Sequence, residues 1–521
     1  MRAIDYFDKS ADANPDRTAI VDGERRLSYR ELRSISERTA RAMWAKGLCG
    51  EQRAAIYSHN HAEVLVCMLG ILRAGGVWVP MSFRSAAEAN IEYLNYSETA
   101  WLFYDGQVRE SIPQLGANVP SLRQLVCLDG DDSENPSLEQ FLQLGANAKE
   151  CDWADAYGNL ERLMGLIPTG GTTGPAKGVR VTNLAWGTMT EMACHYWKSE
   201  EPPVCLCTAP LSHAAGVVAF TIFALGGTNV VMPGFDALQV LKNIERYRVT
   251  HLFLPPTAFY SLLTCPEVAR FDYSSLRVFL LAGSPVSPDK LKQGVRIFGP
   301  CMCQSYGQTE APMLLTWLDP KTLAAAAAGD HPERLRSCGR ATSAVRVAIM
   351  DDAGQTLPAH KTGEIVARGT LLTAGYHNLP EATAQLRAHN WHHTGDIGYM
   401  DEDGYVYIVD RKKDMIISGG FNVFCAEVEA GIMSLPAVQE CAVIGVPHEH
   451  WGEAVKAIVV LREGESLSEE DVIAHCKAKL GSVKSPKSVE FWTELPKTAA
   501  GKLDRKTIRK PYWEGVDREV H

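Results

Sequence analysis

The sequence lacks the long apolar run that a membrane-spanning helix needs. Its longest purely apolar run, residues 64–72, is broken by Arg73, whereas a spanning helix takes about 20 apolar residues. The start, from Met1 to Asp5, runs directly into charged residues and has no apolar core of a signal peptide. We therefore expect a cytoplasmic protein without a transmembrane segment, in which residues 64–72 form a buried helix.

The sequence also lacks a basic run and lacks cysteines at zinc spacing. Lys and Arg number 52 against 62 Asp and Glu, which gives a formal charge of −10, and no stretch could neutralise a nucleic-acid backbone. Two close cysteine pairs, Cys205/Cys207 and Cys301/Cys303, have no matching second pair, so we interpret the cysteines as reduced residues. Nucleic acid is not expected as a partner.

What the chain does contain is the composition and alternation of a soluble α/β protein. Apolar residues make up 46% and charged residues 22%, which is ordinary for a globular protein, and 521 residues predict two or more domains. Helical patterns at residues 29–46 and 63–74 alternate with apolar strands such as residues 54–57, and the alternation recurs over residues 204–281. The predicted class is α/β, with a large N-terminal domain of helix-covered sheets.

The pattern changes near residue 399 and predicts where the large domain ends. Apolar alternation around residues 401–404 indicates a closing β-hairpin. Five charged residues follow at 410–414, and such a solvated crossing is typical of a domain boundary. We therefore predict a large domain at 1–410 and a small, mobile C-terminal α/β domain at 411–521. A capping box beginning at Ser466 predicts a helix in the small domain.

A glycine- and threonine-rich segment at residues 168–178 is the sharpest local signal. Glycines let successive N–H groups point at an anion, threonines add hydroxyl donors, and Lys177 adds charge. The segment is not a Walker loop, because Gly178 follows the lysine; strand-like flanks predict a loop between two strands. A flexible turn is the alternative, but we favour phosphate binding. The candidate residues are Thr169, Gly170, Gly171, Thr172, Thr173, Gly174 and Lys177.

Three further segments carry chemistry that is ambiguous when each is taken alone. The segment from Gln304 to Glu310 reads Gln-Ser-Tyr-Gly-Gln-Thr-Glu, the segment from Thr394 to Asp396 reads Thr-Gly-Asp, and a C-terminal loop ends in Lys502. Separately they could be a surface turn, a structural ion pair and a solvated lysine. A carboxylate beside phosphate oxygens is also the ligand set that magnesium prefers.

Together and in this order, the four segments resemble those of the adenylate-forming superfamily: acyl-CoA synthetases, firefly luciferases and peptide-synthetase adenylation domains. The chain looks closest to the acyl-CoA synthetases. The resemblance implies an AMP- and pyrophosphate-forming acid–thiol ligase that makes an acyl-adenylate and passes the acyl group to coenzyme A. It implies ATP, Mg²⁺ and coenzyme A as cofactors, and a homodimer is compatible with it. A stand-alone adenylation enzyme that loads a carrier protein would share these motifs.

The resemblance also implies roles for individual residues. Lys502, Glu310 and Thr309 would be catalytic, and Glu310 with Thr172 would hold the metal. Tyr306 would stack on adenine, while Asp396 and Arg411 would bind the sugar or phosphate. The remaining implied positions are Gly283, Ser284, Gln304, Ser305 and Gly307 for ATP or AMP, Lys413 for the hinge, and Gly419 and Gly420 for the coenzyme A tunnel.

The acid substrate is predicted from what its expected pocket lacks. Amino-acid-activating members of the superfamily hold the amino group with an aspartate in the stretch that corresponds to residues 210–216, and here that stretch has no carboxylate. Residues 210–220, Phe235 and residues 252–259, which the resemblance places along the acyl tunnel, contain no arginine for a second carboxylate. Apolar side chains dominate these stretches. We expect a hydrophobic monocarboxylic acid, medium-chain or aromatic, bound near His213, Ala214 and Gly216.

Overall fold

The computed structural model describes the chain in two compact units. It describes residues 1–521 except 131, 133, 147–158, 170–175, 498–502 and 515–521. The larger unit comprises Met1–Thr169, Pro175–Val347 and Ala367–His392, and the smaller comprises Ala348–Val366 and His393–His521. The predicted α/β class, with a large N-terminal part of sheets and a smaller C-terminal part, is confirmed. The domain boundary at residues 410/411 stays a prediction.

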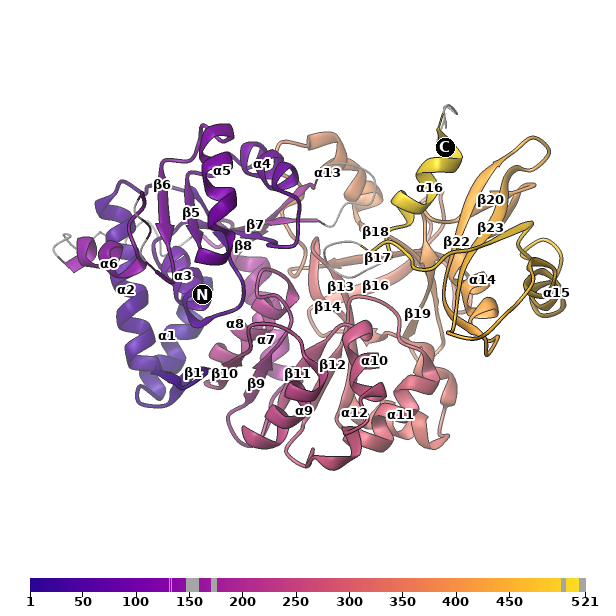
Figure 1. The fold of residues 1–521 in the computed structure, drawn as a ribbon, viewed down its shortest axis with the longest axis horizontal. Coiled ribbons are helices and arrows are strands. Elements are labelled where there is room, and N and C mark those ends of the chain that lie inside the picture. The colour runs from indigo at the N-terminus through magenta and orange to yellow at the C-terminus, as the bar shows by residue number, and fades with distance from the viewer. Residues whose placement is uncertain (131, 133, 147–158, 170–175, 498–502, 515–521) are drawn as a thin grey trace. The chain divides into compact units, whose positions relative to one another are not determined.

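The first sheet of the larger unit is mostly parallel and carries the predicted residues Gln304, Ser305, Tyr306 and Gly307, whereas the glycine-rich segment adjoins the second sheet (Figure 1). Its strand order is β2-β1-β10-β9-β11-β12-β13-β14-β15, and the strands from β1 to β13 in that order are parallel neighbours. The strands are β1 (Thr18–Asp22), β2 (Arg25–Ser28), β9 (Val204–Cys207), β10 (Thr228–Val231), β11 (His251–Leu254), β12 (Val278–Leu281), β13 (Met302–Gln308), β14 (Ala311–Leu318) and β15 (Gly339–Ala341).

The second sheet of the larger unit has the order β6-β5-β3-β4-β7-β8. Its strands are β3 (Arg53–Tyr57), β4 (Val77–Met81), β5 (Trp101–Tyr104), β6 (Gln124–Cys127), β7 (Leu163–Pro168) and β8 (Gly178–Thr182). β7 and β8 pair antiparallel, with Pro168 opposite Gly178. The expectation that the glycine-rich segment joins two strands is thereby confirmed.

Helices cover these sheets; α9, α10 and α11, for example, pack against β9, β11 and β13 (Figure 1). The larger unit contains α1 (Ala3–Ala13), α2 (Tyr29–Ala45), α3 (Ala62–Arg73), α4 (Ala87–Tyr96), α5 (Ile112–Asn118), α6 (Leu138–Ala146), α7 (Asn183–Tyr196), α8 (Ala214–Ala224), α9 (Ala237–Arg246), α10 (Pro256–Thr264), α11 (Pro288–Phe298), α12 (Pro320–Ala328) and α13 (Pro380–Leu386), with 3₁₀ turns at Gly106–Ser111, Val268–Arg270, Pro332–Arg336 and Ala388–Asn390. Every residue of α3 except Glu63 is buried, as expected.

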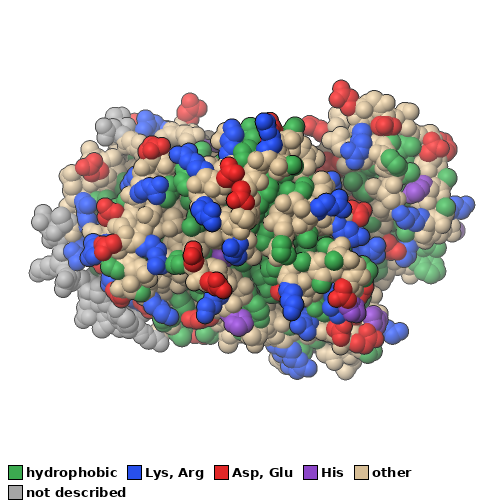
Figure 2. Space-filling view, turned by 90° about the horizontal axis from the view of Figure 1, so that it is seen from below, with side chains coloured by type: hydrophobic (Ala, Val, Ile, Leu, Met, Phe, Trp, Pro, Cys, Tyr) green, Lys and Arg blue, Asp and Glu red, His purple; other side chains and the backbone are tan. Residues whose placement is uncertain are grey.

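Within the described part of the chain, no helix has both the length and the apolar character that crossing a membrane requires. Figure 2 shows acidic and basic side chains interspersed over the face in view. This mixture agrees with the absence of a basic run from the sequence.

The smaller unit contains the predicted hairpin and a second α/β arrangement. Strands β16 (Val345–Met350), β17 (Gly363–Gly369), β18 (His392–Met400) and β19 (Tyr405–Arg411) are neighbours in that order, and β18 and β19 form the hairpin. A further sheet of β20 (Ile416–Ser418), β21 (Phe421–Val423), β22 (Val438–His448), β23 (Gly452–Leu461) and β24 (Ser488–Phe491) packs with α14 (Cys425–Ile432), α15 (Glu469–Leu480) and α16 (Arg505–Trp513).

The start of α15 differs from the prediction by two residues. Ser468, rather than Ser466, is the N-cap: its hydroxyl accepts a hydrogen bond from the Asp471 N–H at 3.1 Å. The Asp471 carboxylate accepts from the Ser468 N–H at 3.1 Å, which closes the reciprocal box. The prediction of Ser466 was wrong because aspartate at the third helical position serves as well as glutamate. Gly481 ends the helix as expected.

Candidate active site

The ends of adjacent parallel strands bring several predicted site residues to one edge of the first sheet. Leu254, at the end of β11, lies opposite Leu281 on β12, and Leu281 lies opposite Gln304 on β13. The segments that follow β9, β12 and β13 therefore leave the sheet at the same edge. The first two of these segments carry His213 and Gly283 with Ser284, while Tyr306 lies on β13 and Thr309 and Glu310 directly follow it. Ligands of open α/β sheets bind at this carboxyl edge.

Thr309 and Glu310 form the two-residue turn between β13 and β14. A close approach of main chain fixes this turn, because a Cβ atom at Gly307 would lie 2.6 Å from the Met313 nitrogen. Met313 itself has a left-handed φ of 54°, which is uncommon outside glycine. The local fold thus requires glycine at 307 and projects Glu310 from the sheet edge.

Glu310 is held at both its side chain and its main chain. The Tyr376 hydroxyl donates to Glu310 Oε1 at 2.6 Å, and the Thr373 N–H and hydroxyl donate to the Glu310 carbonyl at 3.1 and 3.0 Å. Burial, then the Glu310 charge and hydrogen bond, raise the pKa of Tyr376 above its ordinary value, so its hydroxyl stays protonated. The Lys177 ammonium lies 5.0 Å from the centre of the Tyr376 ring.

The His213 loop is fixed by a side chain distant in sequence. Asn60 donates to the Ala209 carbonyl at 2.9 Å and accepts from the Leu211 N–H at 2.8 Å. His213 then occupies the N-cap position of α8, and its ring Nδ1 lies 3.0 Å from the Ser212 hydroxyl. A Cβ at Gly216 would lie 2.1 Å from the Leu211 carbonyl oxygen, so this turn also requires glycine.

The predicted adenine-binding residues differ in exposure. Tyr306, Gln304 and Ser305 are buried on β13. The Ser305 hydroxyl has no hydrogen-bond partner among the residues that the structure describes, and an unpaired buried hydroxyl costs about 1–3 kcal/mol. Gly283 and Ser284 are exposed, and Gly283 has a left-handed φ of 97°.

In the smaller unit, Asp396 and Arg411 face each other across the β18–β19 hairpin. Arg411 Nε lies 3.4 Å from Asp396 Oδ1; the arginine side chain is 47% exposed and the aspartate 9%. This ion pair is the structural alternative left open by the sequence. It is also compatible with a sugar or phosphate ligand, since an arginine this exposed can bind a second anion.

Glu364 supports the segment that carries Asp396. Its carboxylate accepts from the Gly395 N–H at 3.0 Å and the Lys412 ammonium at 3.2 Å, and lies 3.1 Å from His393 Nδ1. Burial would raise the pKa of Glu364, but the His393 hydrogen bond, the Lys412 charge and the Gly395 hydrogen bond together lower it. Glu364 is therefore an ionised centre that connects β18 with the end of β19.

Of the other predicted residues, Thr169 is half-buried and its N–H donates to the Lys177 carbonyl at 2.9 Å, whereas the rest are exposed or lie outside the described ranges. Lys413 is exposed in the turn between β19 and β20, where the Asp414 N–H donates to the Arg411 carbonyl at 3.0 Å. Gly419 and Gly420 are exposed and have φ of 58° and 81°. The residues that fall outside the description are Gly170, Gly171, Thr172, Thr173, Gly174 and Lys502.

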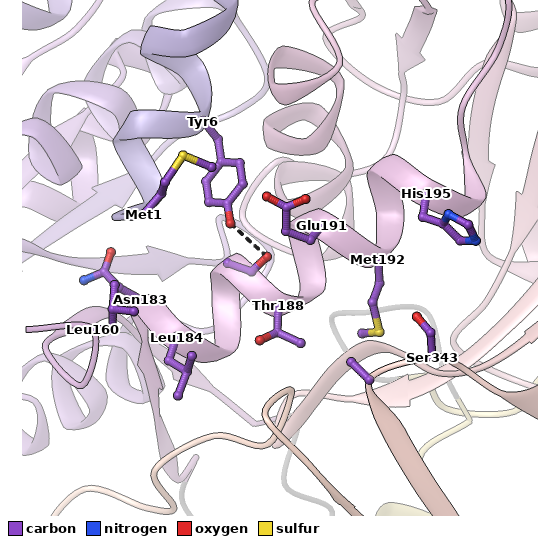
Figure 3. A pocket seen from close by; sticks show the side chains of 12 residues that line it. Met1, Tyr6, Leu160, Asn183, Leu184, Thr188, Glu191, Met192, His195 and Ser343 are labelled. Atoms are coloured by element: carbon purple, nitrogen blue, oxygen red, sulfur yellow. Dashed lines mark hydrogen bonds between the residues drawn. The ribbon is translucent and has the colours of Figure 1, made fainter.

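A pocket of about 460 Å³ lies along α7 in the larger unit (Figure 3). Tyr6, whose hydroxyl donates to the Gly187 carbonyl at 3.3 Å, borders it beside Glu191. His195, Met192 and Ser343 also line it. None of the residues singled out from the sequence contributes to this pocket, so it does not define the candidate active site.

Three supporting residues were missed from the sequence: Asn60, Tyr376 and Glu364. Each acts on a residue far along the chain. Weak signals existed, because Glu364 is a charge at the start of an apolar strand and Tyr376 follows a glycine in a loop. Neither feature of the sequence indicates which distant residue Glu364 or Tyr376 would contact.

Comparison with known proteins identifies the class. A profile of the AMP-binding enzyme family matches residues 7–377, and a profile of the AMP-binding enzyme C-terminal domain matches residues 427–502. The chain belongs to the AMP-binding enzyme family. This result confirms the resemblance inferred from the sequence and, with it, the general class of AMP-forming acid–thiol ligases.

Individual relatives sharpen the comparison. The chain is 42% identical over 368 residues to a medium/long-chain-fatty-acid–CoA ligase of Mycobacterium tuberculosis, covering 69% of this chain but only 63% of that ligase. It is 34% identical over 512 residues to a feruloyl-CoA synthase of an Amycolatopsis species, covering 97% and 98% of the two chains. The ATP-bound structure of MatB from Rhodopseudomonas palustris is 28% identical, with a TM-score of 0.87 over 99% of this chain and 100% of that chain.

Proposed function

We propose that this chain is an ATP-dependent acyl-CoA ligase that activates a hydrophobic monocarboxylic acid, medium-chain or aromatic, and transfers it to coenzyme A. The observation that carries the proposal is the gathering of the His213, Gly283 and Tyr306–Glu310 segments at one carboxyl edge of a parallel sheet. The names of the relatives, which act on fatty acids and ferulate, support the substrate class.

In the first half-reaction the acid's carboxylate attacks the α-phosphorus of ATP, and pyrophosphate leaves. Negative charge must be stabilised at both ends of the reacting centre. Lys177 and Lys502 would supply positive charge, Thr172, Thr173 and Thr309 would donate to phosphate oxygens, and Tyr306 would stack on adenine.

The environment of the Glu310 carboxylate fits a magnesium ion whose remaining ligands are phosphate oxygens and water. Glu310 Oε1 is engaged by Tyr376, while Oε2 has no hydrogen-bond partner among the described residues. Those residues also contain no cluster of three or more metal-ligating side chains. Magnesium commonly uses one or two carboxylates and completes its shell with phosphates and water. When bound there, it would supply charge against the β- and γ-phosphates.

In the second half-reaction the thiol of coenzyme A attacks the acyl carbon, and AMP leaves. Gly419 and Gly420, whose left-handed φ values suit a tight turn without side chains, would border the pantetheine path. Lys413 would be the hinge about which the small domain turns between the two steps. Its exposure in a short turn is compatible with that role.

The acid pocket would be apolar with one imidazole. The N-terminal turns of α8 hold Ala214 and Gly216 beside His213, and most residues along α8 are buried and apolar. A pocket of this kind favours an apolar chain or ring and does not neutralise a second carboxylate. His213 would orient the substrate carboxylate at the pocket mouth.

The experiment that tests the proposal measures AMP release from ATP with a panel of acids, with and without coenzyme A. We expect turnover with medium-chain or aromatic acids that requires coenzyme A. Best turnover with malonate or an amino acid would contradict the pocket assignment. AMP release that needs an acyl carrier protein instead of coenzyme A would favour the carrier-loading alternative.

The proposal extends to location and assembly. A cytoplasmic enzyme is expected, and fractionation of the cells that make it would test this. A homodimer is proposed for the assembly, and light scattering on the purified chain should then give twice the 57.2 kDa mass of one chain.

A further inference from the structure

Glu310 is carried by a half-buried two-residue turn rather than by a strand, so its side chain must be oriented by its contacts. A carboxylate that receives a metal–phosphate complex must present one oxygen in a constant direction. The structure supplies that constraint through Tyr376. Its hydroxyl donates to Oε1 at 2.6 Å, the length of a strong hydrogen bond to an ionised acceptor.

The segment that carries Tyr376 is bound to the strand that follows the glycine-rich loop. The Arg180 N–H donates to the Gly375 carbonyl at 2.8 Å, and the Ala374 N–H donates to the Arg180 carbonyl at 2.9 Å. Tyr376 forms an antiparallel bridge with Val179. Residues 373–377 therefore connect the turn of Glu310 to the start of β8.

The backbone of Tyr376 is fixed from a third direction. Its N–H donates to the Thr383 hydroxyl on α13 at 3.0 Å. Gly375, with a left-handed φ of 89°, leaves room for that helix, since a Cβ there would lie 2.3 Å from Thr383 Cγ2. The position of Tyr376 is therefore fixed independently of Glu310, and the Glu310 carboxylate takes the orientation that the tyrosine hydroxyl sets.

The Tyr376 ring also contacts the phosphate-binding candidate Lys177, whose ammonium lies 5.0 Å from the ring centre. Among the described residues, no salt bridge joins Lys177 and Glu310. The ring gives Lys177 a cation–π partner that leaves its N–H donors free for phosphate, while the hydroxyl of the same tyrosine contacts Glu310.

We propose that Tyr376 is a positioning residue that orients Glu310 for magnesium through its hydroxyl and keeps Lys177 available for phosphate through its ring. The inference rests on the proposed roles of Glu310 and Lys177. It predicts that the hydroxyl and the ring can be separated experimentally, because phenylalanine removes only the first and leucine removes both.

The test measures ATP binding by calorimetry in Mg²⁺ and in EDTA, together with the Mg²⁺ concentration that gives half-maximal pyrophosphate exchange. For Tyr376→Phe we expect that Mg²⁺ concentration to rise roughly tenfold, the loss of one charge-assisted hydrogen bond, with ATP binding in EDTA unchanged. For Tyr376→Leu we expect ATP binding in EDTA to change as well, by about threefold, in line with a lost cation–π contact.

Two control variants distinguish a failure of the inference about Tyr376 from a failure of the proposed function of Glu310. Tyr273→Phe removes a hydroxyl that donates to the Val268 carbonyl at 2.5 Å in another part of the larger unit, and it should leave all these values unchanged. Glu310→Ala in the same assay tests the proposed function itself; a wild-type Mg²⁺ response there would refute the Glu310 role. If Glu310→Ala shifts the response but Tyr376→Phe does not, the inference about Tyr376 alone is overturned. Activity lost by Tyr376→Phe at every Mg²⁺ concentration, with unchanged Mg²⁺ affinity, would also overturn it.

Discussion

The two compact units hold their candidate site residues by different means. In the larger unit, Gly216 and Gly307 lie against main-chain atoms, and Asn60 clamps a loop through neutral hydrogen bonds. In the smaller unit, Asp396 and Glu364 lie among paired charges that connect β18 with β19.

This difference has physical consequences. Close packing of main chain is insensitive to salt and pH, but it does not tolerate one added methyl group. Paired charges tolerate small changes of shape, but they depend on the protonation of each partner. Substitutions should therefore act on geometry in one unit and on charge in the other. The predictions below test that contrast.

The largest effect is expected at the one carboxylate of the larger unit that we assign to magnesium. Glu310→Ala should lower the rate of adenylate formation on the order of a thousandfold, because a lost metal ligand removes charge from the phosphates in the transition state. Acid binding should persist. Pyrophosphate exchange and acid binding measure the two quantities. Glu402→Ala, at the turn of the β18–β19 hairpin, is the control and should retain normal exchange; near-normal exchange by folded Glu310→Ala would move the metal site elsewhere.

A smaller loss is expected for Lys502→Ala, and only in one half-reaction. If the lysine neutralises charge while the carboxylate attacks ATP, adenylation should fall about a hundredfold, as for one preorganised donor. Thioester formation from a supplied acyl-adenylate should be nearly unchanged. Pyrophosphate exchange reports the first half and synthetic adenylate with coenzyme A the second.

The exposed Lys506, a few residues further along, provides the matched lysine control. Equal losses in both halves for Lys502→Ala would contradict a lysine that acts in adenylation alone.

The hinge variant Lys413→Pro should instead slow whichever half-reaction needs the domain orientation that a fixed φ disfavours.

A third prediction concerns the close packing of the larger unit. Gly216→Ala should lower the free energy of unfolding by about 1–3 kcal/mol, because the new methyl group would overlap the Leu211 carbonyl. The loop of His213 should move, so that the KM for the acid rises more than the KM for ATP. Thermal melting and steady-state kinetics measure these effects.

Gly116→Ala in α5 is the control, since its added Cβ meets nothing within 4 Å and alanine favours helix by up to about 1 kcal/mol. Equal melting temperatures for the two variants would show that the Gly216 turn relaxes freely.

Local patterns in the sequence predicted the elements that depend on neighbouring residues. The apolar run of α3, the strands around the glycine-rich loop and the β18–β19 hairpin follow from periodicity and turn residues. The cap of α15 was displaced by two residues, since the local sequence offers two serines with an acidic residue three positions later.

The supporting residues of the site could not be predicted, because their partners are distant in the chain. Asn60 is separated from Leu211 by 151 residues, Tyr376 from Glu310 by 66 and Glu364 from Gly395 by 31. A single sequence shows which residues can donate or accept hydrogen bonds, and the topology of the sheets decides which of them meet.

The smallest effect, and the one that depends on pH, is expected for Glu364→Gln in the smaller unit. Glutamine keeps the size but removes the charge that faces Lys412 and His393, with Asp352 as the other carboxylate bound to Lys412 at 2.8 Å. At pH 7 the free energy of unfolding should fall by about 1–2 kcal/mol, within the range for hydrogen bonds to a charged group.

The sign of the pH dependence follows from the lowered pKa of Glu364. A carboxylate with a depressed folded-state pKa stabilises the fold above its ordinary value of about 4.3, and that contribution is lost as the pH falls through the folded pKa. The stability difference between wild type and Glu364→Gln should be retained from neutral pH down to about 5, because protonation of His393 on acidification only adds a positive charge beside Glu364, and it should shrink below about 4. Denaturant unfolding across this range measures it. Glu402→Gln, which changes a largely exposed carboxylate in a surface pair with His360, should show a much smaller difference at every pH because surface ion pairs contribute little. If Glu364→Gln instead gave a difference that grew as the pH fell below about 4, Glu364 would be protonated in the fold, and the smaller unit would hold Asp396 by packing, as the larger unit holds its own residues.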